Sequence, residues 1–360
     1  MNTAFDPVAR TLNSYIESNE IAGAAVRVRK DGKILSEACL GYSVIEKKQP
    51  VTSKTVFQLA SMSKPITAVL GMTLVEDGKL TLSDPVCKYL PEFSHMPNLT
   101  VRMLFDHSSG ILTGVSGAEF YPVFEDTLSE HVKRISKHPL EFENGKGTGY
   151  SGHGSFDVLG RLIEVVTGDT FEAYLKNRLT APLNMPDTAF RPTQEMKTRK
   201  ADLYEYTEEK TLKNVTGRDS LFLTVDPDRV HHVSGSAGMI GTLDDYERFV
   251  MMLQNEGALD GVRILNPETV RHMHTPSPSH GLEQSPGCIW GLGMMIFRDN
   301  RKSGRALFDG TYGWSGAYGT HFYIAPNENL IMTLMINRSN IGGAGSHVSF
   351  AVEKAIMELF

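Results

Sequence analysis

The sequence predicts an α/β (α+β) fold: an antiparallel sheet flanked by terminal helices, with a mostly helical domain inserted into it. Three observations indicate this arrangement. A helical pattern and two strand patterns open the chain, within residues 5–42. Strand patterns and a last helical pattern fill residues 289–360, and the residues between are mostly helical in periodicity. Segregated strands and helices are typical of α+β proteins, so we expect the strands of both ends to pair in one sheet.

The first element is an amphipathic helix over residues 5–18, followed by a hairpin. Its apolar residues recur at helical spacing: Val8, Leu12, Tyr15 and Ile16. Residues 22–29 are rich in alanine and valine and predict a strand. Lys30-Asp31-Gly32 predicts the hairpin turn, and residues 33–42 predict the return strand.

Residues 57–78 predict a buried helix. One face carries apolar residues at i, i+3, i+4 and i+8, and the other sides are apolar too: Ile66, Val69, Leu70 and Leu74, then Ala68, Met72 and Val75. A helix that is apolar on all sides packs between layers of a protein. Pro65 is tolerated in or near a first helical turn, which places Ser61 and Lys64 at the mouth of this helix. Gly78 predicts its end.

The middle of the chain predicts further helices. They lie at residues 100–105, 128–135, 156–166, 170–179, 243–254 and 266–274. Residues 145–154 are glycine-rich and predict a tight loop that brings backbone close to another group. Residues 186–235 are polar with few periodic stretches, and we expect them to cover the surface.

The C-terminal part predicts four strands and a closing helix. The strands are expected at residues 289–297, 306–309, 317–324 and 330–337. Residues 326–329 predict a turn between the last two. Residues 330–336 are nearly all apolar, as in a central strand covered on both faces. Residues 346–360 predict the helix.

Length and composition limit the class of protein. A chain of 360 residues exceeds what one core usually fills, so two domains are expected. We place a discontinuous sheet domain at residues 1–60 and 235–360 and the helical domain at 61–234. The net charge of −6, without a basic block, gives no support to a nucleic-acid partner. Homo-oligomerisation stays open, because composition does not decide it.

The same composition bears on the compartment. No apolar run approaches the ~18 residues of a membrane span, and the first residues lack a signal-peptide pattern. The three cysteines are odd in number and widely spaced, which indicates a reducing compartment: Cys39, Cys87 and Cys288. A cytoplasmic protein is therefore predicted, unless a leader has been removed.

Ser61 and Lys64 are the first chemical candidates. Residues three apart share one helix face, so the lysine can reach the serine hydroxyl. Burial of the lysine would make it a candidate base, and the positive end of the helix dipole would favour an oxyanion. The alternative is a helix-capping serine beside a solvated lysine, since S-x-x-K is frequent by chance.

Two later segments carry further candidates. Tyr150, in the glycine-rich loop, is either a packing tyrosine or a phenol that passes protons for the serine. Residues 313–317 are expected where a strand starts, and small residues there would let a substrate lie along an exposed edge. The amide of Ala317 would then donate to an oxyanion. The alternative is a plain turn with a core tryptophan, Trp314.

No metal site is predicted. Two histidine pairs, His231–His232 and His272–His274, have no accompanying cluster of acidic residues or cysteines. We interpret them as structural or solvated histidines. No complete G-x-S-x-G motif occurs, which argues against the nucleophile elbow of α/β-hydrolases.

The order Ser61-x-x-Lys64, Tyr150-Ser151 and Trp314-Ser315-Gly316 resembles the serine β-lactamase and penicillin-binding-protein superfamily. Class C β-lactamases and family-eight carboxylesterases are the branches it looks most like. Three further stretches support the resemblance: residues 55–61, 106–110 and 159–168. It runs from about residue 10 to the C-terminus and implies a β-lactamase/transpeptidase-like fold with the active site between the two domains.

The resemblance also implies a serine hydrolase that forms an acyl-enzyme on Ser61. Lys64 and Tyr150 would share the role of base, and the amides of Ser61 and Ala317 would hold the oxyanion. The other candidate substrate-binding residues are Trp314, Ser315, Gly316 and Gly152. The partner is a small-molecule ester or amide, and no cofactor is needed.

Two departures from the family pattern bear on the substrate. The second motif is commonly Tyr-x-Asn, and here it is Tyr150-Ser151-Gly152. The third commonly opens with lysine or histidine, and here it opens with Trp314. We therefore predict a carboxylesterase for small uncharged esters. The alternatives are a β-lactamase, a D-amino-acid amidase or peptidase, an acyltransferase, and a penicillin-binding-like module without turnover.

Overall fold

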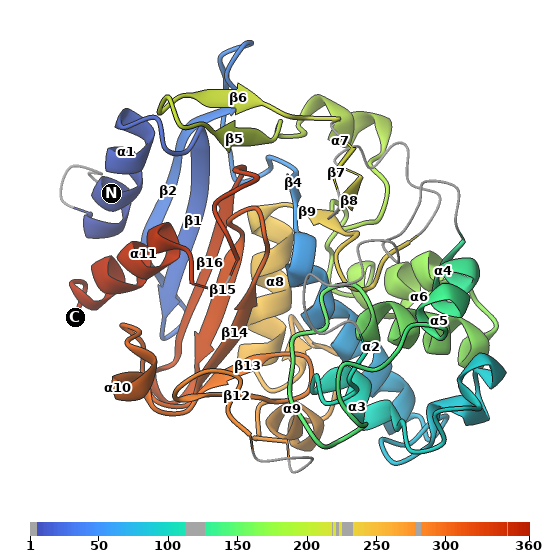
Figure 1. The fold of residues 1–360 in the computed structure, drawn as a ribbon. Coiled ribbons are helices and arrows are strands. Elements are labelled where there is room, and N and C mark those ends of the chain that lie inside the picture. The colour runs from blue at the N-terminus through green and yellow to red at the C-terminus, as the bar shows by residue number, and fades with distance from the viewer. Residues whose placement is uncertain are drawn as a thin grey trace.

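The structure is a computed structural model that describes residues 6–111, 127–217, 219–220, 223–224, 233–277, 282–343 and 345–360. In these residues an eight-stranded antiparallel sheet has the order β12-β13-β14-β15-β16-β1-β2-β3 (Figure 1). Its strands are β1 Gly23–Lys30, β2 Lys33–Val44, β3 Gln49–Pro50, β12 Cys288–Trp290, β13 Met295–Phe297, β14 Thr311–Ser315, β15 His321–Ala325 and β16 Leu330–Ile336. The sheet therefore joins the two ends of the chain, as the sequence predicts.

The junction between the two ends is the pairing of β1 with β16. Ala24 pairs with Ile336 and Lys30 with Leu330, in continuous antiparallel register. All seven residues of β16 are buried. An all-apolar strand needs cover on both faces, and this strand has it because α8 packs on one face and the terminal helices lie on the other (Figure 1).

The helices divide between the sheet and a second group. They are α1 Pro7–Glu17, α2 Ser63–Glu76, α3 Val101–Phe105, α4 Leu128–Ile135, α5 Ser155–Thr167, α6 Phe171–Leu175, α7 Gln194–Thr198, α8 Leu243–Gln254, α9 Pro267–Met273, α10 Asn300–Ser303 and α11 His347–Met357. Helices α1 and α11 contact each other on the outer face of the sheet, and α8 packs on β16 from the inner side (Figure 1). Helices α2 to α6 gather beyond α8. The boundaries of the two predicted domains stay a prediction.

Helix α2 is the buried helix that the sequence predicts. Twelve of its fourteen residues, Ser63 to Leu74, are buried. Gly71 allows close packing, because a Cβ there would lie 2.7 Å from the ring of Phe105 on α3. The α-helix begins at Ser63, so Pro65 lies in its first turn and Ser61 and Lys64 lie at its mouth, as the sequence predicts. Residues Phe57–Gln58 form β4, and Ala60–Met62 form a 3-10 turn, η2.

The C-terminal strands differ from the prediction in three places. Residues 289–297 form the β12–β13 hairpin and not one strand, because Gly293 takes a φ of 87° and reverses the chain. Residues 306–309 are irregular and lead to Gly310, with a φ of 84°. Residues 317–320 form a turn, closed by the Gly316 amide on the carbonyl of Thr320, so β15 begins only at His321.

Within the described residues, four pairs of short strands lie outside the large sheet. They are β4 with β9 Ile240–Gly241, β5 Tyr204–Tyr206 with β6 Leu212–Asn214, β7 Asp219–Ser220 with β8 Leu223–Thr224, and β10 Ala258–Leu259 with β11 Val262–Arg263. The helix predicted at residues 170–179 is α6 followed by a π-helical turn, η6 Lys176–Thr180. In the described parts of the chain, no helix is both long and apolar enough to cross a membrane.

Candidate active site

Ser61 lies on η2, at the entrance to α2. The preceding residue, Ala60, has a φ of 46° and is buried, a left-handed conformation that is uncommon for a residue with a Cβ. The carbonyl of Leu59 accepts a hydrogen bond from the Thr320 hydroxyl at 3.0 Å. A Cβ on Gly316 would lie 2.3 Å from that carbonyl, so only glycine fits. The turn after β14, which contains Gly316 and Thr320, therefore packs directly against the segment that carries Ser61.

Lys64 is 1% exposed and its ammonium group contacts three oxygens. Its Nζ lies 3.2 Å from Ser61 Oγ, 2.8 Å from the carbonyl of Gly152 and 2.9 Å from the carbonyl of Ser236. These three acceptors match the three N–H donors of an ammonium. Gly152, which the sequence analysis considered for its missing side-chain amide, instead contributes its backbone carbonyl to the lysine.

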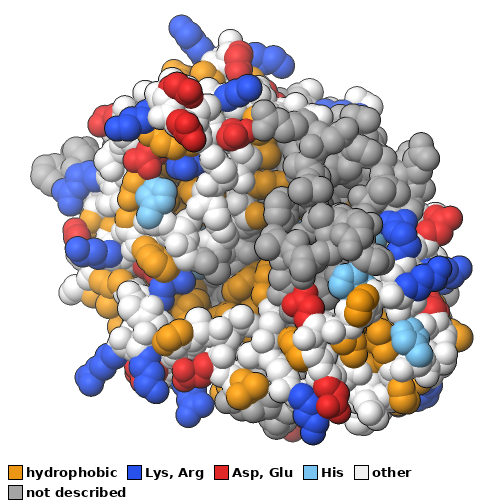
Figure 2. Space-filling view, viewed as in Figure 1, with side chains coloured by type: hydrophobic (Ala, Val, Ile, Leu, Met, Phe, Trp, Pro, Cys, Tyr) orange, Lys and Arg blue, Asp and Glu red, His pale blue; other side chains and the backbone are white. Residues whose placement is uncertain are grey.

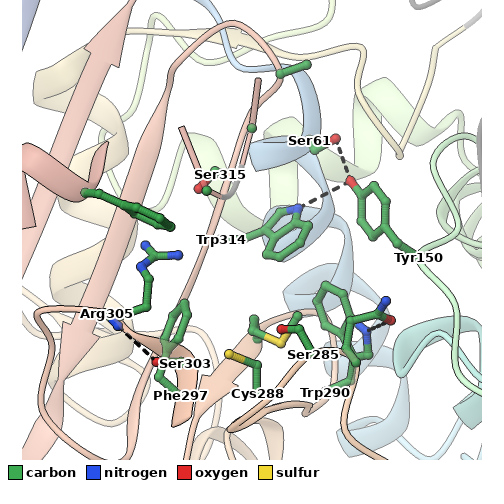
Figure 3. Close-up of a pocket in the computed structure, with 16 residues that line it drawn as sticks. Ser61, Tyr150, Ser285, Cys288, Trp290, Phe297, Ser303, Arg305, Trp314 and Ser315 are labelled. Atoms are coloured by element: carbon green, nitrogen blue, oxygen red, sulfur yellow. Dashed lines mark hydrogen bonds between the residues drawn. The ribbon is translucent and has the colours of Figure 1, made fainter. Parts of the chain in front are cut away.

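Tyr150 completes the contacts of Ser61. Its hydroxyl donates to Ser61 Oγ at 2.7 Å, and the indole N–H of Trp314 donates to the Tyr150 oxygen at 3.3 Å (Figure 3). The Lys64 ammonium lies 4.8 Å from the centre of the Tyr150 ring. The structure thus brings Ser61, Lys64, Tyr150 and Trp314 together from three distant parts of the chain.

The third segment, residues 313–317, lies at the end of β14 and not at the start of a strand. Strand β14 is interior to the sheet, but pairing with β13 stops at Gly313, opposite Met295. Trp314 and Ser315 extend beyond that pair, so this end of the strand is open on one side. Within the described part of the chain, the amide of Ala317 has no hydrogen-bond partner. The segment therefore ends a strand instead of starting one, and its role in holding a substrate stays a prediction.

A cavity of about 450 Å³ connects these groups. Ser61, Tyr150 and Trp314 line one end, and Phe297 and Arg305 lie toward the other (Figure 3). Figure 2 shows hydrophobic side chains gathered in the hollow at the centre of this face. A concave, mostly apolar space with a few directed polar groups is typical of a small-molecule site.

Known proteins with a similar sequence or a similar fold identify the family to which this site belongs. The model of the Beta-lactamase family matches residues 8–351. Protein Rv1367c of Mycobacterium tuberculosis is 30% identical, over 91% of this chain and 88% of its own. Esterase EstB of Burkholderia gladioli is 27% identical, over 92% and 89%. The solved structure titled "EstCE1, a hydrolase with promiscuous acyltransferase activity" superposes with a TM-score of 0.85 at 23% identity, over 98% of both chains.

The chain belongs to the β-lactamase family. The resemblance seen in the motifs is confirmed, and so is the fold class. Membership of this family makes the protein a serine hydrolase.

Sequence analysis of this β-lactamase-family enzyme missed His107, which supports Tyr150. His107 is buried and packs against the rings of Tyr150 and Trp290, with centroid distances of 5.0 and 4.1 Å. Its Nδ1 accepts the amide hydrogen of Ser151 at 3.0 Å. Burial, and secondarily the charge of Lys64, hold the pKa of His107 well below its usual value. The neutral ring thus fixes the loop beside Tyr150 without adding a second charge.

A second missed residue, Asp157, holds the acceptor of Lys64 in place. Its Oδ1 accepts hydrogen bonds from the Ser234 hydroxyl and the Ser236 amide, both at 2.8 Å. Its Oδ2 lies 3.2 Å from Nε2 of His131. The carboxylate therefore orients the Ser236 carbonyl toward the lysine. Nothing in the local sequence marks this role, because the partners are separated by about eighty residues and meet only in the folded enzyme.

The histidines considered for metal binding have other surroundings. His274 stacks on the ring of Tyr312, 4.4 Å away and nearly parallel, and burial lowers its pKa. Burial also lowers the pKa of His272. His231 and His232 lie outside the described residues. Among the residues that are described, no group of three or more His, Cys, Asp or Glu is arranged to hold a metal ion.

Proposed function

We propose that this enzyme is a carboxylesterase that hydrolyses small uncharged esters through an acyl-enzyme on Ser61. One observation carries the proposal: Tyr150 and Lys64 both contact Ser61 Oγ, while an uncharged Trp314 stands where the family has a cation. The naming of EstB as an esterase supports the choice of ester over lactam.

In the acylation step Ser61 attacks the ester carbonyl and passes its proton to the Tyr150–Lys64 pair. The pair then gives this proton to the leaving alcohol. The form of the pair that accepts this proton is a Tyr150 phenolate beside the Lys64 ammonium, and the ammonium and the Trp314 N–H both stabilise that phenolate. The short contact of 2.7 Å between the two oxygens supports direct transfer.

The oxyanion of the tetrahedral intermediate is held by backbone amides. Ala317 supports this role because its amide has no partner in the described structure and the residue lines the same cavity as Ser61. The amide of Ser61 is the second donor, at the N-terminal end of α2, where the helix dipole favours negative charge. Water, or an acceptor alcohol, then releases the acyl group.

Trp314 supports the preference for uncharged substrates. Its indole has one N–H donor and no charge, and that donor already contacts Tyr150. A substrate carboxylate beside the ring would lose hydration without gaining an ion pair, at a cost of several kcal/mol. An acyl chain would instead gain about 25 cal/mol for each Å² that it buries.

The test compares kcat/KM for p-nitrophenyl butyrate with kcat/KM for a chromogenic cephalosporin. We expect the wild type to favour the ester by at least ~100-fold, about 2.7 kcal/mol. Trp314→Lys should narrow the gap. The control Trp314→Phe adds no charge, so it should lower kcat/KM for both substrates alike and leave their ratio unchanged. A wild type that hydrolyses the cephalosporin faster would restore the lactamase, peptidase or amidase alternative. Failure of a fluorophosphonate probe to label Ser61 would favour a binding module.

A further inference from the structure

A buried chain of polar side chains begins in the substrate cavity and runs into the sheet. Ser315 Oγ lies 2.6 Å from Nδ1 of His321, its register partner on β15. Nε2 of His321 lies 3.1 Å from Oε1 of Glu353 on α11. Arg305 Nε donates to the other oxygen of Glu353 at 2.8 Å, and its Nη2 contacts Oε1. Ser315, His321 and Glu353 are each at most 3% exposed.

The partners determine where the hydrogens lie in this chain. Hydrogen bonds from Arg305 and His321 keep Glu353 ionised although it is buried, so its oxygens only accept. The ring hydrogen of a neutral His321 is therefore on Nε2. Nδ1 then has its lone pair toward Ser315, whose hydroxyl donates to it. The lone pairs of the Ser315 oxygen remain for other donors.

Two further contacts make Nδ1 suited to receive a proton. Once protonated, it would donate both to Ser315 Oγ and to the Trp314 carbonyl, which lies 3.2 Å away. The Glu353 carboxylate on the opposite side of the ring would stabilise the imidazolium. Burying such a chain costs desolvation energy, and acylation through Tyr150 and Lys64 does not use it.

We propose that Ser315, His321 and Glu353 form a second proton-accepting unit, which activates the hydroxyl that attacks the acyl-enzyme. Ser315 is the member that touches the attacking water or alcohol, because it lines the same cavity as Ser61. His321 and Glu353 act through it as positioning and proton-holding residues. This inference rests on the proposed acyl-enzyme mechanism and assigns its second half to separate residues.

In deacylation the attacking hydroxyl replaces Ser61 on the acyl carbon. The attacking oxygen forms a bond to the acyl carbon, and the carbonyl electron pair moves to the carbonyl oxygen. The proton of the attacking hydroxyl passes to Ser315 Oγ, and the Ser315 proton passes to His321 Nδ1. The Tyr150–Lys64 pair, which gave its proton to the leaving alcohol during acylation, takes up one from solvent before collapse. Collapse then reforms the carbonyl and breaks the bond from carbon to Ser61 Oγ, which takes that proton from the pair. His321 releases its proton to solvent.

The experiment separates acylation from deacylation with p-nitrophenyl butyrate in stopped flow. In Ser315→Ala and His321→Gln, we expect p-nitrophenol release in the first turnover to stay within ~3-fold of wild type. Steady-state turnover should fall at least ~10-fold, and butyryl-Ser61 should accumulate in intact-protein mass spectra. Glutamine can hold hydrogen bonds but cannot take the proton, so it distinguishes proton transfer from positioning. Ser14→Ala is the control, since Ser14 is exposed on α1, away from the cavity, and its hydroxyl donates to the Thr11 carbonyl.

Three results would overturn the inference. The first is a variant that loses acylation and deacylation equally. The second is a Ser315→Ala variant with unchanged deacylation. The third is a His321→Gln variant that deacylates like wild type. Glu353→Gln provides a second variant, expected to show the same selective loss, if thermal melts show that His321→Gln is unfolded. An enzyme that never carries butyryl on Ser61 would refute the proposed function itself. An acyl-enzyme that forms and decays normally in the variants would refute only the role of Ser315, His321 and Glu353.

Discussion

The indole N–H of Trp314 donates to the hydroxyl oxygen of Tyr150 over 3.3 Å. The residue that replaces the family's cation thus contacts the proposed catalytic tyrosine directly, in addition to lining the cavity. In the proposed mechanism this contact gives Trp314 two roles, in selecting uncharged substrates and in supporting proton transfer.

Trp314→Phe should therefore lower kcat for p-nitrophenyl butyrate by about 10-fold, with KM little changed. The substitution keeps an aromatic wall and removes one hydrogen bond that stabilises the Tyr150 phenolate, the form that accepts the Ser61 proton. Steady-state kinetics on the purified variant provide the measurement. A variant with wild-type kcat would show that the N–H does not assist the transfer.

Ser61→Ala should abolish ester hydrolysis and leave the fold intact. Ser61 donates to no group that holds α2 together, and alanine is compatible with the short 3-10 turn that it occupies. Hydrolysis of p-nitrophenyl butyrate and circular dichroism are measured on the same sample. Wild-type turnover by folded Ser61→Ala would remove the nucleophile from the mechanism.

Lys64→Ala and Tyr150→Phe should each lose at least ~100-fold in rate, and the double variant should lose much less than the product. Groups that act as one unit are strongly non-additive. The two residues meet at one oxygen, with contacts of 3.2 and 2.7 Å to Ser61 Oγ. A double-mutant cycle on kcat/KM measures the coupling. Losses that simply multiply would mean that the residues work independently.

Gly316→Ala should reduce both stability and activity. A Cβ at this position would lie 2.2 Å from Thr320 Oγ1 and 2.3 Å from the Leu59 carbonyl, so the segment before Ser61 must shift. We expect a loss of about 1–3 kcal/mol in unfolding free energy, as for other overpacked sites. The matched control is Gly343→Ala, where the added Cβ meets nothing closer than 3.8 Å. Similar denaturation midpoints for both variants would contradict the proposed clash.

Asp245 should make stability fall as pH rises. Burial raises the pKa of this carboxyl to about 7, against hydrogen bonds from the Asp187 amide and the Thr188 hydroxyl. The folded protein then holds a proton that the unfolded chain releases near pH 4, so stability declines between those two pKa values. Asp245→Asn should raise Tm at about pH 8 and have little effect at about pH 4, where the carboxyl is protonated in the folded state and about half protonated in the unfolded chain. A gain that is equal at both pH values would disprove this titration.

The sheet of joined ends, the buried α2 and the three motif segments could all be predicted from the amino-acid sequence. These features follow from local information: the apolar all-round pattern of residues 63–76, the alternation around the turn at residues 30–32, and the spacing of Ser61 and Lys64. Such patterns report burial and element type within a window of a few turns. The strand predictions at residues 289–297 and 306–309 were wrong because Gly293 and Gly310 take positive φ angles, at which the chain turns.

The groups that surround the motif residues could not be predicted from the sequence, because they meet only in the folded chain. The Gly152 and Ser236 carbonyls on Lys64, the packing of His107 on Tyr150 and the contact of Trp314 with Tyr150 join segments far apart in the chain. The pairing of His321 with Glu353 likewise depends on α11 lying against the sheet. Side-chain hydrogen bonds need atoms within about 3.5 Å and in the right direction. Sequence periodicity places a residue on a face but does not specify which distant residue meets it there.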